Sequence, residues 1–294
     1  MVDAANSGEA WISKLGLGCS QLGSVLTKGG DLPEALLEAA YEAGVRFFDT
    51  ADIYGQGDSE RLIGRTVARR KDVRICTKVG QRFPLKMRIL MPIKVPLKRL
   101  IAASPTLSSK ARAARVGTLP TCFEPAYLRR AVESSLKRLG VDHVDMLMLH
   151  GATAEEICQG DALDVLGRLS REGKFRVLGI SCEDLRSAEV ALGNRSVRAI
   201  QIPFIYGDAR ARDIAFRGTA ANVEVIARQI LSGSGVATST DPETRRGALA
   251  RASRSAIGCP DVAVALLGTT SRIHLFEVIA ALGGNANEPI VQDR

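Results

Sequence analysis

The sequence is poor in histidine, in closely paired cysteines and in long apolar runs, and each shortage argues against a class of protein. Three histidines occur in 294 residues, and the six cysteines include no Cys-x-x-Cys pair, so we expect no zinc or other metal site. No stretch approaches the roughly 18 consecutive apolar residues of a membrane-spanning helix. The first residues, from Met1 to Asn6, contain an acid and no apolar run, so we expect no signal peptide and a cytoplasmic location.

Acidic residues are missing from one segment, which holds much of the basic charge. Between Gln81 and Gly117 there are nine lysines and arginines and no acid. Without this segment the net charge changes from +8 to −1, so the high isoelectric point is a property of one insertion. A uniformly basic nucleic-acid-binding surface is therefore not supported, and we expect no nucleic-acid partner.

Eight short apolar segments recur along the chain and predict buried parallel strands. Segments with helical periodicity separate them, and alternating strands and helices predict a parallel sheet. Eight such units predict a closed (β/α)8 TIM barrel, and we expect residues 1–294 to form one barrel domain. The strand cores are Leu15–Gly18, Arg46–Asp49, Arg74–Thr77, Met146–Leu149, Val177–Ile180, Ala199–Ile202, Glu224–Ala227 and Val264–Leu267.

The first long helix has recognisable boundary signals. The residues Asp31-Leu32-Pro33-Glu34 resemble a capping box, which predicts that Asp31 caps a helix with Pro33 in its first turn. Gly44 follows the apolar stripe of this helix and can end it.

One connection is far longer than the others. Residues 82–124 separate the third strand from the helix that begins near Pro125, whereas strand-to-helix loops usually have about 2–6 residues. Such a loop is either a functional lid or a flexible solvated segment. Barrel topology places it at the C-terminal mouth, where we hypothesise that its lysines and arginines favour an anionic substrate.

Four ionisable residues stand at the C-terminal ends of predicted strands, where barrel enzymes carry out their chemistry. Asp49, Lys78 and His150 each close an apolar run, and Tyr54 follows Asp49 closely. A nearby ammonium lowers the pKa of a phenol, and a carboxylate beside the lysine keeps it charged. A histidine can hydrogen-bond at the same oxygen. The four residues therefore predict a proton donor and an oxyanion site for a carbonyl group.

These residues belong to a series of motifs that together resemble the aldo-keto reductase family, from about Leu15 to Leu282. The motifs are Phe48-Asp49-Thr50-Ala51-Asp52-Ile53-Tyr54-Gly55, Ser59-Glu60, Leu62-Ile63-Gly64, Thr77-Lys78, Leu149-His150, Gly179-Ile180-Ser181 and Gly268-Thr269-Thr270.

The resemblance implies a barrel that reversibly reduces an aldehyde or ketone to an alcohol with NAD(P)H. It assigns Tyr54 as the general acid and His150 as the group that orients the carbonyl. Lys78, paired with Asp49, would lower the pKa of Tyr54. The hydride would come from C4 of the nicotinamide.

The resemblance also assigns residues to the nicotinamide half of the cofactor site, which includes Asp49. Ser181 and Gln201 match residues that hold the carboxamide, and Ser20 and Gln21 would lie near the ribose. Ser181 is followed by Cys182, whereas many members have Asn there. Arg228 stands where some members have an aromatic residue, and it would approach the pyrophosphate or stack by its guanidinium.

The last strand–helix unit resembles the adenosine-phosphate site. Backbone N–H groups at the helix start can bind a phosphate, and Arg272 would add charge for a 2′-phosphate. His274 stands where many NADPH users have Arg, so NADP is favoured while NAD or dual use stays open. The residues assigned to this site are Gly268, Thr269, Thr270, Arg272, His274 and Glu277.

Two other functions fit a barrel with these residues. A Schiff-base aldolase would use Lys78 as a nucleophile, but Asp49 should hold that lysine charged. A non-enzymatic subunit that senses nicotinamide nucleotides would need no intact catalytic residues. The sequence leaves open the physiological substrate and whether the chain is a monomer or a homo-oligomer.

Overall fold

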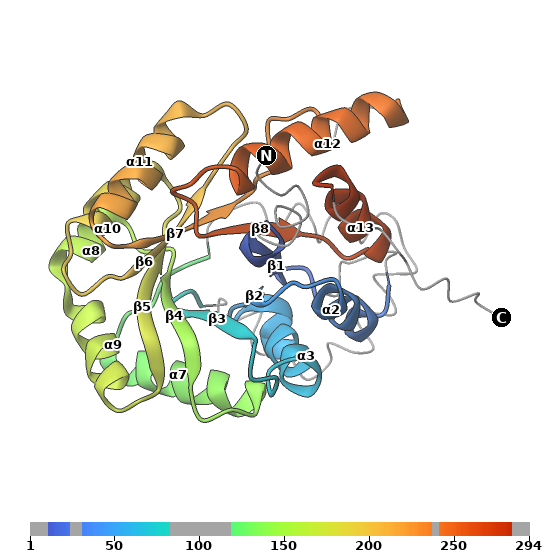
Figure 1. The fold of residues 1–294 in the computed structure, drawn as a ribbon. Coiled ribbons are helices and arrows are strands. Elements are labelled where there is room, and N and C mark those ends of the chain that lie inside the picture. The colour runs from blue at the N-terminus through green and yellow to red at the C-terminus, as the bar shows by residue number, and fades with distance from the viewer. Residues whose placement is uncertain (1–10, 24–30, 83–118, 237–240, 284–294) are drawn as a thin grey trace, which may run out of the picture.

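The computed structural model describes residues 11–23, 31–82, 119–236 and 241–283. Eight parallel strands close in chain order into a barrel, with β8 beside β1 (Figure 1), which confirms the predicted fold. The strands are β1 (Leu15–Gly18), β2 (Phe47–Asp49), β3 (Arg74–Val79), β4 (Val144–His150), β5 (Phe175–Ser181), β6 (Ala199–Pro203), β7 (Glu224–Arg228) and β8 (Val264–Gly268).

Helices surround the ring of strands (Figure 1). Two short 3₁₀ turns, η1 (Ile12–Lys14) and η2 (Tyr54–Gly57), precede β1 and follow β2. Within the described ranges, no helix combines the length and the apolar character needed to cross a membrane. The α-helices are α2 (Pro33–Glu42), α3 (Asp58–Thr66), α7 (Pro125–Leu139), α8 (Ala154–Gln159), α9 (Asp161–Arg171), α10 (Leu185–Leu192), α11 (Ala209–Ala220), α12 (Pro242–Ile257) and α13 (Arg272–Ala281).

All eight predicted strand cores coincide with observed strands, although several strands extend further. Arg46 lies just before β2, while β4 and β5 continue to His150 and Ser181. These two residues are register partners. The strands continue past the apolar runs because polar end residues still pair through their backbones.

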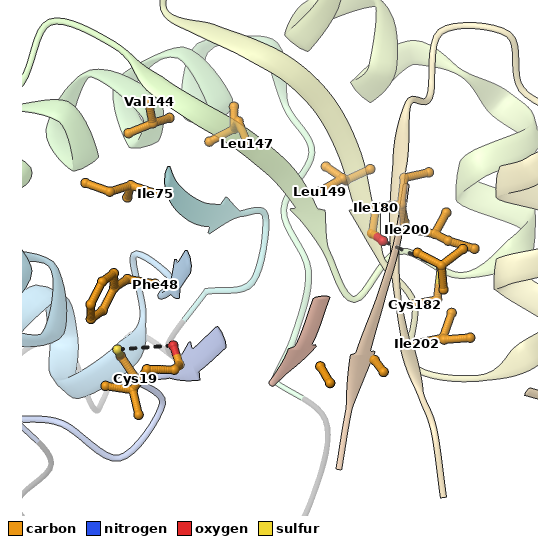
Figure 2. Packing of buried hydrophobic residues seen from close by; sticks show 14 of the residues in the cluster. Cys19, Phe48, Ile75, Val144, Leu147, Leu149, Ile180, Cys182, Ile200 and Ile202 are labelled. Carbon is orange, nitrogen blue, oxygen red and sulfur yellow. Dashed lines mark hydrogen bonds between the residues drawn. The ribbon is translucent and has the colours of Figure 1, made fainter. Parts of the chain in front are cut away.

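The strands bury side chains on both faces, which explains their continuous apolar sequences. Phe48, Ile75 and Leu147 belong to the outer core beneath the helices (Figure 2). The alternate residues fill the barrel interior. This inner core consists of Phe47, Cys76, Met146, Met148, Ala199, Ile226, Val264 and Leu266.

The capping box predicted for Asp31 is wrong, although Pro33 does begin α2. No side chain caps the N-terminus of α2 by a hydrogen bond, and Leu32 occupies the capping position. Asp31 instead accepts a hydrogen bond from the backbone N–H of Arg272, at the start of α13. Any helix N-terminus can stabilise a carboxylate, so local sequence alone did not decide which helix start Asp31 would bind.

The two ends of the long connection after β3 lie side by side. Gln81 and Thr121 form an antiparallel bridge. The N–H of Arg82 donates to Pro120 O at 2.8 Å, and the N–H of Cys122 donates to Gly80 O at 2.7 Å. Residues 83–118, the bulk of the insertion predicted at 82–124, lie outside the described residues.

A buried ion pair joins α3 to α7 outside the ring of strands. The fully buried carboxylate of Glu60 accepts hydrogen bonds from Arg138 Nε at 2.6 Å and from Thr77 Oγ1 at 2.7 Å. The helices approach closely because Gly64 has no side chain; a Cβ there would lie 2.6 Å from Leu139 O. Glu60 therefore depends on Arg138 for its charge balance.

Replacing Arg138 with methionine should destabilise the protein by about 3–5 kcal/mol, because it leaves a buried carboxylate without its counterion. Chemical denaturation measures this change. Arg129→Met provides a matched control on α7, since Arg129 pairs with Glu172 in solvent and exposed pairs contribute little. Equal losses of stability in the two variants would contradict the account.

Candidate active site

Three predicted catalytic residues lie in the top layer of the barrel interior. Successive residues of a strand face opposite sides, so residues two apart share a face. Asp49, Lys78 and His150 each stand two positions beyond an inner-core residue. The pairs are Phe47 and Asp49, Cys76 and Lys78, and Met148 and His150. Tyr54 comes from the η2 turn after β2.

Asp49 and Lys78 form a buried ion pair. Lys78 Nζ lies 2.6 Å from Asp49 Oδ1 and 2.7 Å from Oδ2, and it also donates to Thr50 O at 3.0 Å. The exposed fractions are 0% for Lys78 and 4% for Asp49. Burial by itself lowers the pKa of Lys78, but the Asp49 carboxylate outweighs it, and the pKa lies above its ordinary value. Lys78 is therefore an ammonium at neutral pH.

Tyr54 is held beside this ammonium, with its hydroxyl 3.5 Å from Lys78 Nζ. Burial raises the pKa of Tyr54, Lys78 lowers it and Asp49 raises it again, with a net direction above 10.0. Lys78 does lower the pKa of Tyr54, as the sequence predicted, but in the protein alone burial of the phenol outweighs this contribution. Tyr54 consequently keeps its proton at neutral pH.

His150 lies edge-on to Tyr54, with ring centroids 5.8 Å apart and an interplanar angle of 84°. Burial, Lys78 and Arg228 together hold the pKa of His150 well below its ordinary value. His150 is therefore a neutral imidazole, which has one N–H donor and one acceptor nitrogen. Its Nδ1 is buried and has no hydrogen-bond partner within the described residues.

The structure connects two predicted cofactor contacts to the catalytic residues. Ser181 Oγ donates to Gln201 Oε1 at 3.0 Å, and Gln201 Nε2 donates to Asp49 Oδ1 at 2.9 Å. Ser181 and Gln201 are register partners on β5 and β6. A single hydrogen-bonded chain thus runs from Ser181 through Gln201 and Asp49 to Lys78.

A cavity of about 960 Å³ opens above this layer. Asp49, Tyr54 and Gln201 contribute to its lining. Gly18 and Gly268, which are register partners on β1 and β8, line it as well. A Cβ on Gly268 would meet no atom within 4 Å, so this side of the cavity is open to a bound group. The other predicted residues along it are Ser20, Gln21 and Arg228.

Arg228 ends β7 and is anchored across the mouth of the barrel. Its Nη2 donates to Cys182 O at 2.8 Å and lies 3.4 Å from Glu183 Oε2. Its Nε is buried without a hydrogen-bond partner in the part of the chain that the structure describes. The guanidinium therefore supplies a fixed positive charge at the cavity wall.

The loop after β7 lines much of the cavity, and the sequence analysis missed it. Gly233 and Gly235 both have positive φ angles, which glycine adopts without strain. The run Ser232-Gly233-Ser234-Gly235 was the available signal, because small residues let a backbone approach a ligand closely. The lining residues of this loop are Gln229, Ile230, Leu231, Ser232, Gly233, Gly235 and Val236.

The start of α13 is already engaged by a carboxylate. Asp31 Oδ2 accepts the N–H of Arg272, and Asp31 Oδ1 lies 3.1 Å from Arg272 Nε. The N–H of Asp31 donates to Thr270 O at 3.1 Å. In the protein alone, Asp31 thus occupies part of this helix start, and the phosphate site assigned to it stays a prediction.

The remaining residues predicted for the adenosine-phosphate site are not brought to the cavity. Thr269 Oγ1 accepts the N–H of Ser271 at 3.1 Å, which stabilises a local turn. Glu277 pairs with Arg245 at 3.2 Å, and His274 is exposed on α13. Of this unit, only Gly268 is among the cavity-lining residues of the described chain.

The site brings three chemical groups close together: a phenol that keeps its proton, an ammonium fixed beside it, and a neutral imidazole. Such a set can deliver a proton to a developing oxyanion and stabilise it electrostatically. Within the described ranges, no group of three or more His, Cys, Asp or Glu residues is placed to hold a metal ion.

Comparisons with known proteins agree with this fold. An uncharacterized oxidoreductase, YqkF, of Bacillus subtilis (strain 168) is 30% identical over 173 residues, 58% of this chain and 45% of the relative. "Aldo-keto reductase yakc [NADP(+)]" of Schizosaccharomyces pombe is 26% identical over 201 residues, 67% of this chain and 50% of the relative. The matched segments thus span about half of each curated relative.

A solved structure shows the same barrel. The holo form of aldo-keto reductase AKR11C1 from Bacillus halodurans superposes with a TM-score of 0.69 at 22% identity, covering 92% of this chain and 87% of that chain. The model of the "Aldo/keto reductase family" matches residues 14–285, almost the whole barrel. The chain therefore belongs to the aldo/keto reductase family.

Proposed function

We propose that the protein reduces an aldehyde or ketone to an alcohol with NADPH, reversibly, and that Tyr54 is the general acid. The observation that carries this proposal is the buried Asp49–Lys78 pair beside a protonated Tyr54 on the wall of a large cavity. The Schizosaccharomyces pombe relative, named for NADP(+), supports the choice of cofactor.

The residues along the cavity fit a nicotinamide dinucleotide. The volume of about 960 Å³ lies at the upper end of small-molecule sites, and Gly18 and Gly268 leave a surface without side chains. Arg228 and the glycine-containing loop after β7 suit phosphate groups, because they offer positive charge and accessible backbone. When bound, the nicotinamide would supply the hydride from its C4 atom.

In this proposal, the side chains of the protein handle the proton and orient the substrate. Tyr54 donates its hydroxyl proton to the carbonyl oxygen as negative charge develops there. Lys78 stabilises the phenolate that results, and Asp49 keeps Lys78 charged. His150, as a neutral imidazole, donates one N–H to the same carbonyl oxygen and so fixes the direction of the carbonyl group.

We propose that the preferred substrates are small anionic carbonyl compounds. The support is the sequence of the connection after β3, in which nine basic residues and no acid occur between Gln81 and Gly117. A Schiff-base mechanism is disfavoured, because an ammonium has no free electron pair and Asp49 holds Lys78 in that form. A non-enzymatic nucleotide sensor is also disfavoured, because Tyr54, Lys78 and His150 would have no role in it.

Replacing Tyr54 with phenylalanine should lower the turnover number by about 10²–10⁴-fold, the usual contribution of a general acid. Nucleotide binding should persist, because the ring remains while the hydroxyl is lost. Nicotinamide fluorescence measures binding, and consumption of NADPH with a panel of carbonyl compounds measures turnover. Full turnover in the variant would refute Tyr54 as the acid, and failure of the wild type to bind either nucleotide would refute the function.

The reduction rate at saturating substrates should stay level through neutral pH. Tyr54 carries its proton below a pKa that lies above 10.0, and His150, with its lowered pKa, does not titrate near 6.5. Reduction should therefore decline only at alkaline pH, as Tyr54 loses its proton. Alcohol oxidation needs the phenolate as a base and should accelerate as pH rises. A fall in the reduction rate between about pH 6 and 8 would contradict this assignment.

Replacing Asp31 with asparagine should tighten NADPH binding by about tenfold while leaving NADH binding unchanged. The change removes a carboxylate that engages Arg272, and it thereby frees one charge-assisted interaction for a 2′-phosphate. Fluorescence titration with each nucleotide measures the effect. Asp184→Asn is the control, because Asp184 also accepts a backbone N–H at a helix start, that of Ser187 on α10, and lies far from Arg272 in the sequence. Equal changes for both nucleotides would rule out a role for Arg272 in binding the 2′-phosphate.

A further inference from the structure

The two carboxylate oxygens of Asp49 accept different numbers of hydrogen bonds. Oδ2 accepts from Lys78 Nζ at 2.7 Å, while Oδ1 accepts both from Lys78 Nζ at 2.6 Å and from Gln201 Nε2 at 2.9 Å. All three side chains are almost fully buried. Each donor to an ionised carboxylate offsets part of the same negative charge, so the two donors share it. Gln201 therefore competes with Lys78 for Asp49.

The hydrogen-bond partners of the Gln201 amide determine its orientation. An ionised carboxylate can only accept hydrogen bonds, so the amide nitrogen must face Asp49. The amide oxygen then faces Ser181, whose hydroxyl donates to it at 3.0 Å. With both ends bonded, the positive end of the amide dipole is held against Asp49.

We propose that Gln201 is a positioning residue: by donating to Asp49, it leaves more of the positive charge of Lys78 acting on the Tyr54 hydroxyl. Its role in catalysis rests on the proposed function of Tyr54, but the coupling itself is a property of the protein without nucleotide. This role differs from contact with the carboxamide of the nicotinamide, because loss of such a contact would affect nucleotide binding alone.

The charges that surround Tyr54 set the direction of the effect. Lys78 and Arg228 favour the phenolate, whereas Asp49 opposes it, and His150 faces the phenol as a neutral ring. Removing the Gln201 amide leaves the charge of Asp49 less compensated while the two cations stay in place. The pKa of Tyr54 should consequently rise.

The test measures the ionisation of Tyr54 directly in the protein without nucleotide. A fluorinated tyrosine at position 54 brings the titration into a reachable pH range, and fluorine NMR follows it. Gln201→Leu should raise the pKa of this residue by about one unit. Ser59→Ala is the matched control, because it removes the buried hydrogen bonds of Ser59, at the start of α3, with Thr50 Oγ1 and Cys19 O without touching Asp49. The control should leave the titration unchanged.

A second variant gives a readout that a purely structural role would not produce. Gln201→Glu preserves the shape, and its carboxyl can donate to Asp49 only while protonated. Hydride transfer in single turnovers at saturating nucleotide should then decline as pH rises through the pKa of the introduced carboxyl, whereas the wild type should keep a level rate. This variant also serves if Gln201→Leu fails to fold.

The outcomes separate this proposal from the proposed function. Weakened nucleotide binding with an unchanged Tyr54 titration in Gln201→Leu would overturn it, as would a level pH profile in Gln201→Glu. A shifted titration supports the coupling whether or not the protein reduces carbonyl compounds. Loss of activity in Tyr54→Phe is the separate measurement that decides the function.

Discussion

The buried contact between Asp49 and Lys78 is the interaction on which the rest of the site depends. An ammonium with no exposed surface would lose its proton or unfold the barrel top if its counterion were absent. Asp49 prevents both, and it also accepts a hydrogen bond from Gln201, so one carboxylate holds both Lys78 and Gln201 in place. The pKa of Tyr54 therefore depends on the charges of both Asp49 and Lys78 rather than on Lys78 alone.

The register of the strands in the closed barrel determines which of these side chains lie next to each other. Parallel pairing brings His150 beside Ser181 and Ser181 beside Gln201, although the residues are far apart in sequence. Strand alternation turns the end residues inward above an apolar interior. The same geometry places Gly18 opposite Gly268, which leaves one side of the cavity open. The outer helices then need only enclose the strands, with Glu60 and Arg138 joining α3 to α7.

The sequence predicted the features that follow from local pattern. Apolar runs predicted the eight strands, and polar strand ends predicted which side chains would meet, because topology requires parallel strands to end at one rim. It did not predict what depends on competition among distant groups. Asp31 precedes α2 in the sequence, but its carboxylate accepts a hydrogen bond from Arg272 at the start of α13 instead. The pKa of Tyr54 rises because burial exceeds a charge effect of opposite sign, and a sequence shows no burial.

The ionisation state of Lys78 tests the central claim most directly. Nitrogen-detected NMR of the side-chain amine reads that state in the protein without ligands, and Asp49→Asn provides the comparison. The account predicts an ammonium in the wild type throughout the pH range in which the protein stays folded, and a markedly lowered pKa of Lys78 once Asp49 is neutralised. A neutral amine at neutral pH in the wild type, or equal titration in both proteins, would contradict it.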